Sequence, residues 1–532
     1  MPEKSKPLVI TNFGGGLTRR NVGDINSGKT KFETSWGYDP FSKPGNLTWL
    51  EQPTSIYTWG ASPVGPMMAM RQRTEGSSNN VYGIDVGDRL YEIDVNNSTN
   101  PDLDSVNTVG SLIAANYDRG GYLTFYGSTE KVFVTNDDNI QKINFNGTSA
   151  SVIGLFTNDV PHPLAQFLGK IYFGNSNNIG EVDSTEVVTS VGKLDPALPS
   201  GLIVRDLDIT PDGNYLQITA SRNNVPTPYG GAQDTYSSSA ADSYKFYWNG
   251  INPSYTTLES YSGLVLASNV IQGNENYTFG YDTNGAAIFL GPTKVVSLPK
   301  VITPNPNAVF SNGNMLGFAT TDYEDSSDQF RTAIYSYGQY DEEISKGLFR
   351  LLRQGALIED EVMAVSACVP VSNKIYAASV WGTISDNIVG TAKIYYSTQE
   401  RDTGGNTTNK LWRFFPSPRG NRSILAGIYE TQTQLFSKKT AVKEVRIYTE
   451  PLVGGNDFIV DLIGSGGSVM AGGSQRFQVA TGSVATGTDM VQFNPAMAPT
   501  YALGLRITNS SVTGVAQWTA LKAEVDIVEG GK

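Results

Sequence analysis

The sequence "NVYGIDVGDRLYEIDV" (residues 80–95) indicates the fold, because its layout returns twice further along the chain. The later copies are "KVFVTNDDNIQKINF" (131–145) and "KIYFGNSNNIGEVD" (170–183). Each copy has an aromatic residue in a short apolar strand, then a turn rich in Asp, Asn or Gly, and then a strand with two apolar residues three apart. The aromatic residues are Tyr82, Phe133 and Tyr172, and the apolar pairs are Leu90 and Ile93, Ile140 and Ile143, and Ile179 and Val182. A hairpin that recurs every 40 to 50 residues or so is typical of a β-propeller, in which each blade buries its faces against its neighbours.

Weaker copies of the same unit continue the series to about residue 400. They lie at 207–220, 277–290, 312–338 and 373–398. Divided among seven blades, residues 54–400 provide about 50 residues each, which is a usual blade length, and six or eight blades also fit. We therefore predict an all-β chain with a β-propeller of about seven blades, in which the three aromatic residues above occupy equivalent buried sites.

The sequence on either side of the propeller has a different character. Residues 401–440 contain many polar turn residues and are interpreted as a linker or irregular connection. From 441 to 532, apolar and polar residues alternate as in half-buried antiparallel strands, which predicts a C-terminal β-sandwich. Residues 1–53 hold one apolar strand, at 7–13, among many glycines and prolines. They predict an extended N-terminal strap whose strand completes a blade and closes the ring.

The composition favours strands over helices. Charged residues make up 17% of the chain and aromatic residues 11%, with 27 tyrosines and 56 glycines. This usage is typical of short strands joined by tight turns. One stretch, residues 342–361, has the pattern of a short helix, although Gly347 and Gly355 weaken it.

The charge and the single cysteine narrow the classes of function. The formal net charge is −12, and such a surface repels nucleic acid. Cys368 is the one cysteine, so no disulfide forms within the chain, and its apolar surroundings predict a buried strand. The N-terminus lacks the apolar core of a secretion signal, and no apolar run reaches the length of a membrane span. We expect a soluble protein that is made in a reducing cytoplasm.

The stretch "GDINSGKT" (23–30) matches the phosphate-binding loop pattern of nucleotide-binding enzymes. That loop needs a buried strand before it and a helix after it. Upstream, glycines and the Arg19–Arg20 pair interrupt any buried strand, and downstream Gly37 and Pro40 interrupt a helix. We therefore interpret 23–30 as a turn.

Candidates for catalytic residues are few. His162 is the one histidine and stands between two prolines, where a turn residue is favoured over a general base. With one histidine and one cysteine, a zinc site of Cys and His ligands is nearly excluded. Carboxylates are clustered at Glu324–Asp325, 341–343 and 359–361. Such clusters are usually solvated loops, although a pair of them at the right separation could hydrolyse a glycoside.

A calcium loop is weakly indicated at Asp94, Asn96 and Ser98, which begin like an oxygen-ligand loop. The sixth position lacks the glycine of such loops, and Ser105 stands at the twelfth. We predict no catalytic, cofactor-binding or metal-binding residues, no cofactor, and a protein that is not an enzyme.

The opening of the chain, "ITNFGGGLTRRNVGDINSGKTKFETSWGYDPFSKPGNLTWLEQP" (10–53), resembles the starts of tailed-bacteriophage tail proteins. The matching pieces are Phe13 to Leu17, Asp24 to Gly28, Tyr38–Asp39 and Pro44 to Leu47. Together with the propeller and the acidic balance, they resemble the nozzle (tail tubular) proteins of short-tailed phages. The predicted C-terminal sandwich departs from that family.

The resemblance implies a structural component of a phage virion, made in the host cytoplasm and located in the tail. It would form a ring of about six copies on the DNA exit channel, in contact with neighbouring tail or adaptor proteins and tail fibres. DNA would pass without tight binding, past acidic channel-facing loops for which 341–343 and 359–361 are the candidates, and no part would insert into a membrane. Two alternatives remain: a carbohydrate- or receptor-binding propeller of the virion, and a glycoside hydrolase.

Overall fold

The computed structural model describes the chain from Lys6 to Glu529 with gaps. The residues outside the described part are 1–5, 14–31, 40–42, 44, 51, 60–66, 74–79, 86, 95–104, 114–120, 127–130, 146, 159, 223–241, 263–264, 273–274, 283–284, 298–300, 303–308, 313–314, 325–328, 339–346, 358–364, 372–392, 402–406, 415–421, 425, 480–482, 510–511, 516–517 and 530–532. Every regular element in the described part is a β-strand, so the all-β prediction is confirmed.

Most strands belong to antiparallel sheets that follow one another along the chain. The first sheet contains β6 (Met67–Gln72), β7 (Val81–Asp85), β8 (Arg89–Asp94) and β9 (Ser105–Ser111). The second contains β10 (Tyr122–Phe125), β11 (Lys131–Thr135), β12 (Asn139–Asn144) and β13 (Ser151–Leu155). The third contains β14 (Leu164–Phe167), β15 (Lys170–Asn175), β16 (Asn178–Val182) and β17 (Val188–Ser190). The fourth contains β18 (Ile203–Ile209), β19 (Leu216–Ser221), β20 (Asp242–Trp248) and β21 (Thr256–Ser262).

Three further sheets continue the series. The fifth contains β22 (Val265–Gln272), β23 (Glu275–Asp282), β24 (Gly285–Leu290) and β25 (Thr293–Ser297). The sixth contains β26 (Val301–Ile302), β27 (Val309–Asn312), β28 (Met315–Glu324), β29 (Gln329–Gly338) and β30 (Gly347–Leu357). The last contains β31 (Val365–Val371), β32 (Lys393–Arg401), β33 (Thr407–Phe414) and, on its outer edge, β5 (Thr54–Trp59).

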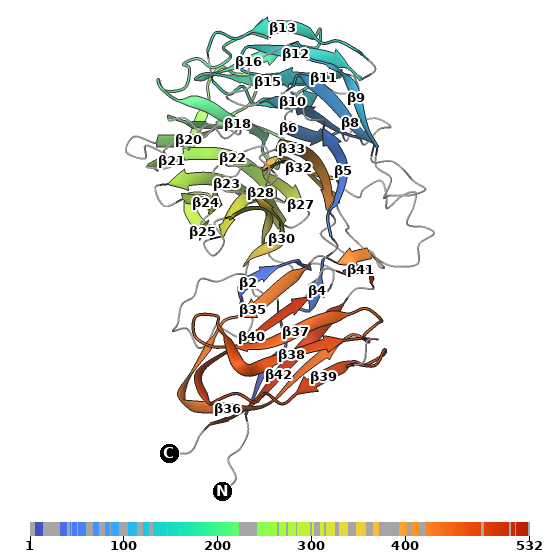
Figure 1. Cartoon of the computed structure of the whole chain (residues 1–532). Helices are drawn as coiled ribbons and strands as arrows, with labels where there is room; N and C mark the ends of the chain where they lie inside the picture. Colours follow the sequence, from blue (N-terminus) through green and yellow to red (C-terminus); the bar gives the residue numbers. More distant parts are fainter. Residues whose placement is uncertain are drawn as a thin grey trace.

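These sheets form a β-propeller (Figure 1). Their inner strands contact one another in turn from β6 through β10, β14, β18, β22 and β27 to β31, and β31 contacts β6. Residues 372–392, between β31 and β32, lie outside the described part, so the number of blades stays a prediction.

The aromatic residue of the sequence repeat takes the same structural position in each of the first three sheets. Tyr82, Phe133 and Tyr172 lie on the second strand of their sheets, opposite Glu92, Lys142 and Glu181. All three aromatic side chains are buried. The prediction that they occupy equivalent buried sites is therefore confirmed.

Strand alternation explains why the repeat needs both an aromatic residue and its apolar neighbour. Tyr82 packs in one cluster with Val132 of the next sheet, and Phe133 packs with Ile171 of the sheet after that. Since successive side chains of a strand point to opposite faces, each second strand contacts both neighbouring sheets. The apolar pair does the same on the third strand: Ile140 packs with Phe133, and Ile143 packs with Tyr82.

The ring closes through β5, and the prediction that the strand at 7–13 closes it is wrong. β5 pairs with β33, so the start of the propeller segment completes the last sheet. β1 (Lys6–Ile10) instead pairs with β42 (Thr519–Glu529), the last strand of the chain. Leu8 and Ile10 of β1 are buried in the core beneath β42, which gives this pairing its driving force.

A second unit is built from both ends of the chain. Its eleven-stranded curled sheet has the central order β2-β35-β40-β36-β42-β4-β3, and β34 pairs separately with β41. The strands not yet given are β2 (Phe32–Trp36), β3 (Tyr38–Asp39), β4 (Leu47–Trp49), β34 (Arg422–Ile424), β35 (Gly427–Thr431), β36 (Gln434–Thr449), β37 (Asp457–Ile463), β38 (Val469–Gln478), β39 (Met490–Phe493), β40 (Thr500–Asn509) and β41 (Val512–Val515). The propeller is thus an insertion between β4 and β34.

This topology differs from the predicted boundaries. The predicted strap, 1–53, supplies β1 to β4 of the curled sheet, so in its described part it is integral to that unit. The predicted linker, 401–440, supplies the propeller strand β33 and the curled-sheet strand β35. Local alternation is weak in both stretches, and their strands are held by partners far away in the chain.

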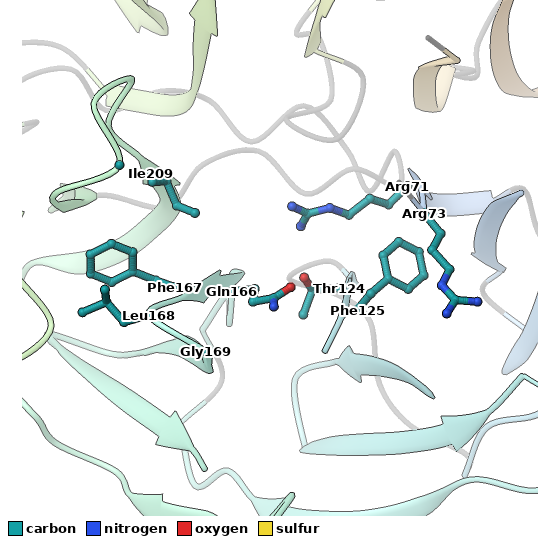
Figure 2. Close-up of a pocket in the computed structure, with 10 residues that line it drawn as sticks. Arg71, Arg73, Thr124, Phe125, Gln166, Phe167, Leu168, Gly169 and Ile209 are labelled. Carbon is teal, nitrogen blue, oxygen red and sulfur yellow. The ribbon is translucent and has the colours of Figure 1, made fainter. Parts of the chain in front are cut away.

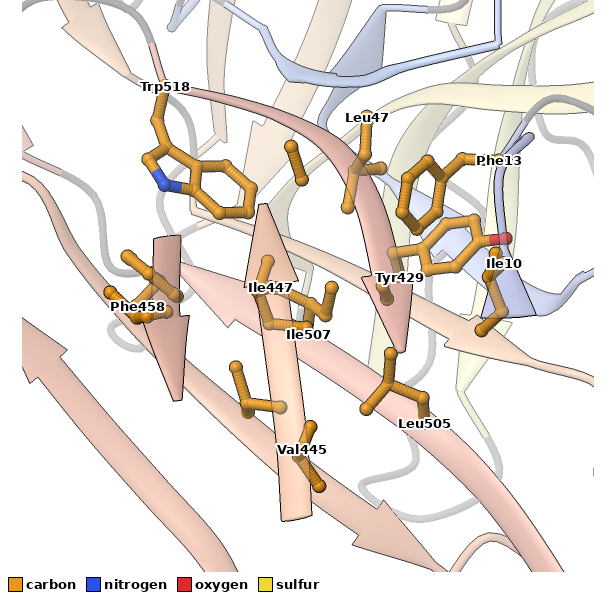
Figure 3. Packing of buried hydrophobic residues seen from close by; sticks show 14 of the residues in the cluster. Ile10, Phe13, Leu47, Tyr429, Val445, Ile447, Phe458, Leu505, Ile507 and Trp518 are labelled. Atoms are coloured by element: carbon orange, nitrogen blue, oxygen red, sulfur yellow. The ribbon is translucent and has the colours of Figure 1, made fainter. Parts of the chain in front are cut away.

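Aromatic rings from both chain ends fill the core of the curled sheet (Figure 3). Trp49 stacks on Trp518 with ring centroids 5.6 Å apart, and Phe13 meets Tyr429 edge-on at 5.3 Å. Phe349 of β30 belongs to the same buried cluster. The sixth sheet therefore packs the propeller against the curled sheet.

The helix predicted over 342–361 is wrong for its described residues, because 347–357 form the strand β30. β30 pairs along its length with β29, and its residues Leu348 and Phe349 are both buried, on different clusters. Burial on both faces favours a strand between two packed layers over an amphipathic helix. Tertiary pairing here overrides the local pattern.

Candidate functional site

The inner strands of the first four sheets end around one pocket at the propeller axis. Arg71 lies on β6, Thr124 on β10, Gln166 on β14 and Ile209 on β18, each at or near the last residue of its strand. The cavity they line has a volume of about 430 Å³ (Figure 2). Pockets of this size take small ligands.

The polar side of the pocket contains two arginines from one strand end. Arg71 extends toward Gln166 and Thr124 (Figure 2). Protein surrounds its side chain, but part of that side chain stays exposed to solvent. Arg73 is only 8% exposed, and its guanidinium carbon lies 4.3 Å from the centre of the Phe145 ring. The Nε–H of Arg73 is buried and has no hydrogen-bond partner among the described residues. Leaving such a donor unpaired costs about 1–3 kcal/mol.

The other side of the pocket is apolar. It is formed by Phe167 and Leu168, with Gly169 at the turn that follows β14, whereas Phe125 lies beside Arg73 (Figure 2). The hydroxyl of Tyr126 donates a hydrogen bond of 2.7 Å to the Gly169 carbonyl, which holds this turn in place. A pocket that combines aromatic rings with charged donors suits a ligand with both ring faces and anionic oxygens.

Two carboxylates of β18 lie close enough to Arg71 to interact with it electrostatically. Asp206 and Asp208 belong to the fourth sheet and Arg71 to the first, so this interaction crosses the axis. Burial raises the pKa of Asp208 well above its usual range, and the neighbouring Asp206 raises it further, against the attraction of Arg71 and Lys245. The Oδ2 atom of Asp208 is buried without a hydrogen-bond partner in the described structure.

Behind Asp208, part of the contact between the fourth and fifth sheets is polar, while Tyr261 packs on Ala287 and Phe289 elsewhere in it. Gln217, opposite Asp208 in the sheet, is fully buried and accepts a hydrogen bond from Asn276 of β23. Lys245 is 1% exposed, and its Nζ lies 3.5 Å from a carboxylate oxygen of Glu259. Burial lowers the pKa of Lys245, with Glu259 and then Asp208 opposing that shift.

His162 is a core residue and lies outside the pocket. Its side chain is 1% exposed and stacks on Phe156 with ring centroids 3.6 Å apart. Its Nδ1–H donates to the Gly174 carbonyl over 2.8 Å. Burial lowers the pKa of His162, so the neutral ring fills the contact between the second and third sheets.

The other residues singled out from the sequence do not meet at the axis. Cys368 lies in a strand, β31, opposite Tyr396, and Asp94 faces Ser105 across the β8–β9 hairpin. Glu324 is the last residue of β28.

Several candidates lie outside the described residues: 23–30, Asn96, Ser98, Asp325, 341–343 and 359–361. Within the described ranges, no group of three or more His, Cys, Asp or Glu side chains is arranged to hold a metal ion. The same part of the chain contains no helix long and apolar enough to cross a membrane.

Sequence reasoning missed Arg71, Arg73, Asp206 and Asp208. Their signal is present in "MRQR" (70–73) and "RDLDI" (205–209), where charged residues occupy strands that a propeller places innermost. Charged side chains are rarely placed in such strands without a partner or a ligand.

Comparison with known proteins gives no match to a family model and none to a curated protein. Among solved structures, the chain is similar to the GH74 enzyme of Niastella koreensis at 10% identity and a TM-score of 0.34, over 74% of this chain and 71% of that one. It is similar to polysaccharide lyase Uly1 at 9% identity and a TM-score of 0.34, over 78% and 100%. It is similar to the subtype N11 neuraminidase-like protein of A/flat-faced bat/Peru/033/2010 (H18N11) at 8% identity and a TM-score of 0.28, over 72% and 97%.

These neighbours correct one prediction. The sequence predicted a protein that is not an enzyme; that prediction is withdrawn, since structures titled as a GH74 enzyme and a polysaccharide lyase are among those similar to this chain. With TM-scores of 0.34 or less, the likeness itself assigns no reaction or ligand to the chain. The protein is a β-propeller on the strength of its own strand topology, and its site is the pocket at the axis.

Proposed function

We propose that the protein binds an acidic saccharide in the axial pocket. The observation that carries this proposal is that two arginines, Arg71 and Arg73, line one pocket together with the polar side chains of Thr124 and Gln166. A guanidinium pairs with a carboxylate through two parallel hydrogen bonds, which is the geometry an acidic sugar offers.

The neighbouring groups suit the rest of such a ligand. Thr124 and Gln166 carry donor and acceptor atoms of the kind that bind sugar hydroxyls, and Phe125 and Phe167 provide ring faces. The chain as a whole carries a net charge of −12, which repels anions. Binding of an acidic sugar would therefore depend on the local positive charge of the two arginines.

Calorimetry with N-acetylneuraminic acid, galacturonic acid and neutral galactose tests the proposal. We expect an acidic sugar to bind and galactose to bind more weakly. Arg71→Gln and Arg73→Gln should each weaken binding by about tenfold or more, because a charge-assisted hydrogen bond contributes about 1.5–3 kcal/mol. Arg222→Gln is the matched control, since Arg222 is an exposed arginine of the fourth sheet that faces Asp242 at 3.7 Å. Equal affinity in all three variants, or no binding of either acidic sugar, would contradict the proposal.

A second function is favoured by the opening sequence. We propose that the protein is a structural component of a tailed-phage virion, in the tail, and that the saccharide pocket serves that particle. The proposal rests on the resemblance of residues 10–53 to phage tail proteins. In this role about six copies would form a ring beside tail or adaptor proteins and fibres, and DNA would pass without tight binding.

Electron microscopy of the purified protein and of its parent particle tests this role. We expect a closed ring of several copies and no duplex DNA binding at physiological salt. A monomer in both samples, or tight salt-sensitive binding of duplex DNA, would contradict the proposal that the protein forms a ring through which DNA passes.

A further inference from the structure

The hairpin turn between β14 and β15 contains a leucine in a backbone conformation that leucine disfavours. Phe167 pairs with Lys170, so the turn consists of Leu168 and Gly169 alone. Their φ angles are 48° and 70°, the left-handed values that a two-residue turn of type I′ needs at both positions. Asn-Gly is a preferred pair for this turn, whereas a bulky apolar residue at positive φ is an outlier.

Burial does little to offset this strain, because Leu168 is 55% exposed. Its side chain is backed by the loop after β20, where a Cβ atom added at Gly250 would lie 2.9 Å from Leu168 Cδ1. The loop therefore holds the leucine in place and leaves the rest of it facing solvent. Backbone strain of this kind is concentrated at ligand-binding and active sites.

Leu168 lines the axial pocket, and a second exposed aliphatic residue lines it too. Ile209, the last residue of β18, is 39% exposed and belongs to the fourth sheet, whereas Leu168 belongs to the third. The two lie on the side of the pocket away from Arg71 (Figure 2). A single exposed leucine is ordinary on a protein surface, but two aliphatic residues from different sheets on one pocket indicate a ligand. We call Leu168 and Ile209 the apolar wall.

We propose that the acidic saccharide of this pocket carries an alkyl or acyl chain that packs against the apolar wall. This inference rests on the proposed saccharide function and names its substrate class, an amphiphilic acidic sugar. The wall and the arginines line one cavity of about 430 Å³, so a ligand whose carboxylate is bound by Arg71 and Arg73 has its other end beside Leu168. Each methylene of the chain that leaves water there strengthens binding by about fourfold.

Calorimetry of the full-length protein with the methyl and hexyl glycosides of N-acetylneuraminic acid, galacturonic acid and galactose tests the proposal. This set varies the charge of the sugar and the length of the chain independently. We expect the hexyl glycoside of an acidic sugar to bind at least about tenfold more tightly than its methyl glycoside, because burial of two methylenes gives that factor. Equal affinity of the two glycosides for the wild-type protein would overturn the proposal.

Two variants remove the apolar wall, and a matched control leaves it intact. Leu168→Asn and Ile209→Ser should each reduce the gain from the hexyl chain to less than about threefold. Leu155→Asn makes the same change at the last residue of β13, which is 76% exposed and does not line the pocket, and it should keep the full gain. Loss of the gain in this control, or no loss in either wall variant, would overturn the assignment.

Urea unfolding of Leu168→Asn separates a ligand contact from a packing role. Since Asn-Gly suits the turn, this variant should unfold at the same urea concentration as the wild-type protein or at a higher one. A lower midpoint would show that Leu168 packs the fold, and it would overturn its place in the apolar wall.

The two proposals fail separately. Binding of an acidic glycoside without a gain from the hexyl chain would overturn the apolar wall and leave the saccharide function standing. Absence of binding by every acidic glycoside, or equal binding of acidic and neutral ones, would overturn both.

Discussion

The apolar contact between two neighbouring propeller sheets differs from a polar part of another contact between such sheets. Between the second and third sheets, Phe133, Ile140, Ile171 and Phe173 pack as one apolar cluster. Between the fourth and fifth sheets, buried Gln217 binds Asn276, and buried Lys245 faces Glu259 in the fourth sheet. The apolar contact needs only shape, whereas the polar one needs specific partners.

The two contacts also differ in how well their buried polar groups are paired. The polar contact adjoins Asp208, and the Nε2 of Gln217 and the Oδ1 of Asn276 are buried there without partners among the described residues. Buried polar groups that are only partly satisfied lower stability, so this part of the ring should contribute less to stability than the apolar contact. The comparison predicts at which positions a substitution lowers the free energy of unfolding most.

The largest expected effect is in the apolar contact. Phe133→Ala should lower the free energy of unfolding by about 3–5 kcal/mol, because the fully buried ring leaves a cavity between two close-packed sheets. Urea unfolding measures the loss. Phe145→Ala, at a partly buried ring beside the pocket, should cost less, and an equal cost would contradict the special role of the repeat positions.

In the polar contact, a smaller loss of unfolding free energy is expected, and a second substitution should restore part of it. Gln217→Leu leaves the Asn276 amide without its partner and should cost about 1–3 kcal/mol. The double variant with Asn276→Leu should recover part of that loss, because both polar groups are then replaced by apolar ones. Additive losses in a double-mutant cycle would show that the two amides do not act as a pair.

The pH dependence of stability should have opposite signs at His162 and Asp208. The folded-state pKa of His162 is lowered by burial, so its contribution is present above about pH 6.5 and is lost as the pH falls below that value. The folded-state pKa of Asp208 is raised, so its contribution is present below about pH 3.9 and is lost as the pH rises through the folded-state pKa. Each slope is at most about 1.4 kcal/mol per pH unit. The midpoint of urea unfolding is measured against pH for wild type, His162→Gln and Asp208→Asn. The His162→Gln curve should lack the loss of stability at low pH, and the Asp208→Asn curve should lack the loss as the pH rises. Curves that match wild type for both variants would contradict these two pKa shifts.

The smallest expected effect is at a position in neither contact. Lys29→Ala changes the lysine of the phosphate-loop match at 23–30, which lies outside the described residues. Since we interpret that match as a turn, stability should change by less than about 0.5 kcal/mol, and calorimetry should detect no ATP binding. Micromolar, Mg²⁺-dependent binding that the variant loses would restore a nucleotide site.

The propeller was predictable because its repeat is local. Tyr82, Phe133 and Tyr172 each stand at the same distance from an Asp- or Asn-rich turn, and strand alternation alone determines which face they occupy. Alternation likewise predicted strands such as β37 and β40 in the curled sheet.

Partner choice was decided only by the tertiary structure. β1 pairs with β42, and β5 with β33, through contacts between residues at opposite ends of their units, for which no local pattern exists. The site depends on the same closure, because its lining residues Arg71 and Ile209 come together only when the first and fourth sheets face each other across the axis. A sequence specifies the face on which each side chain lies, but the ring geometry determines which faces meet.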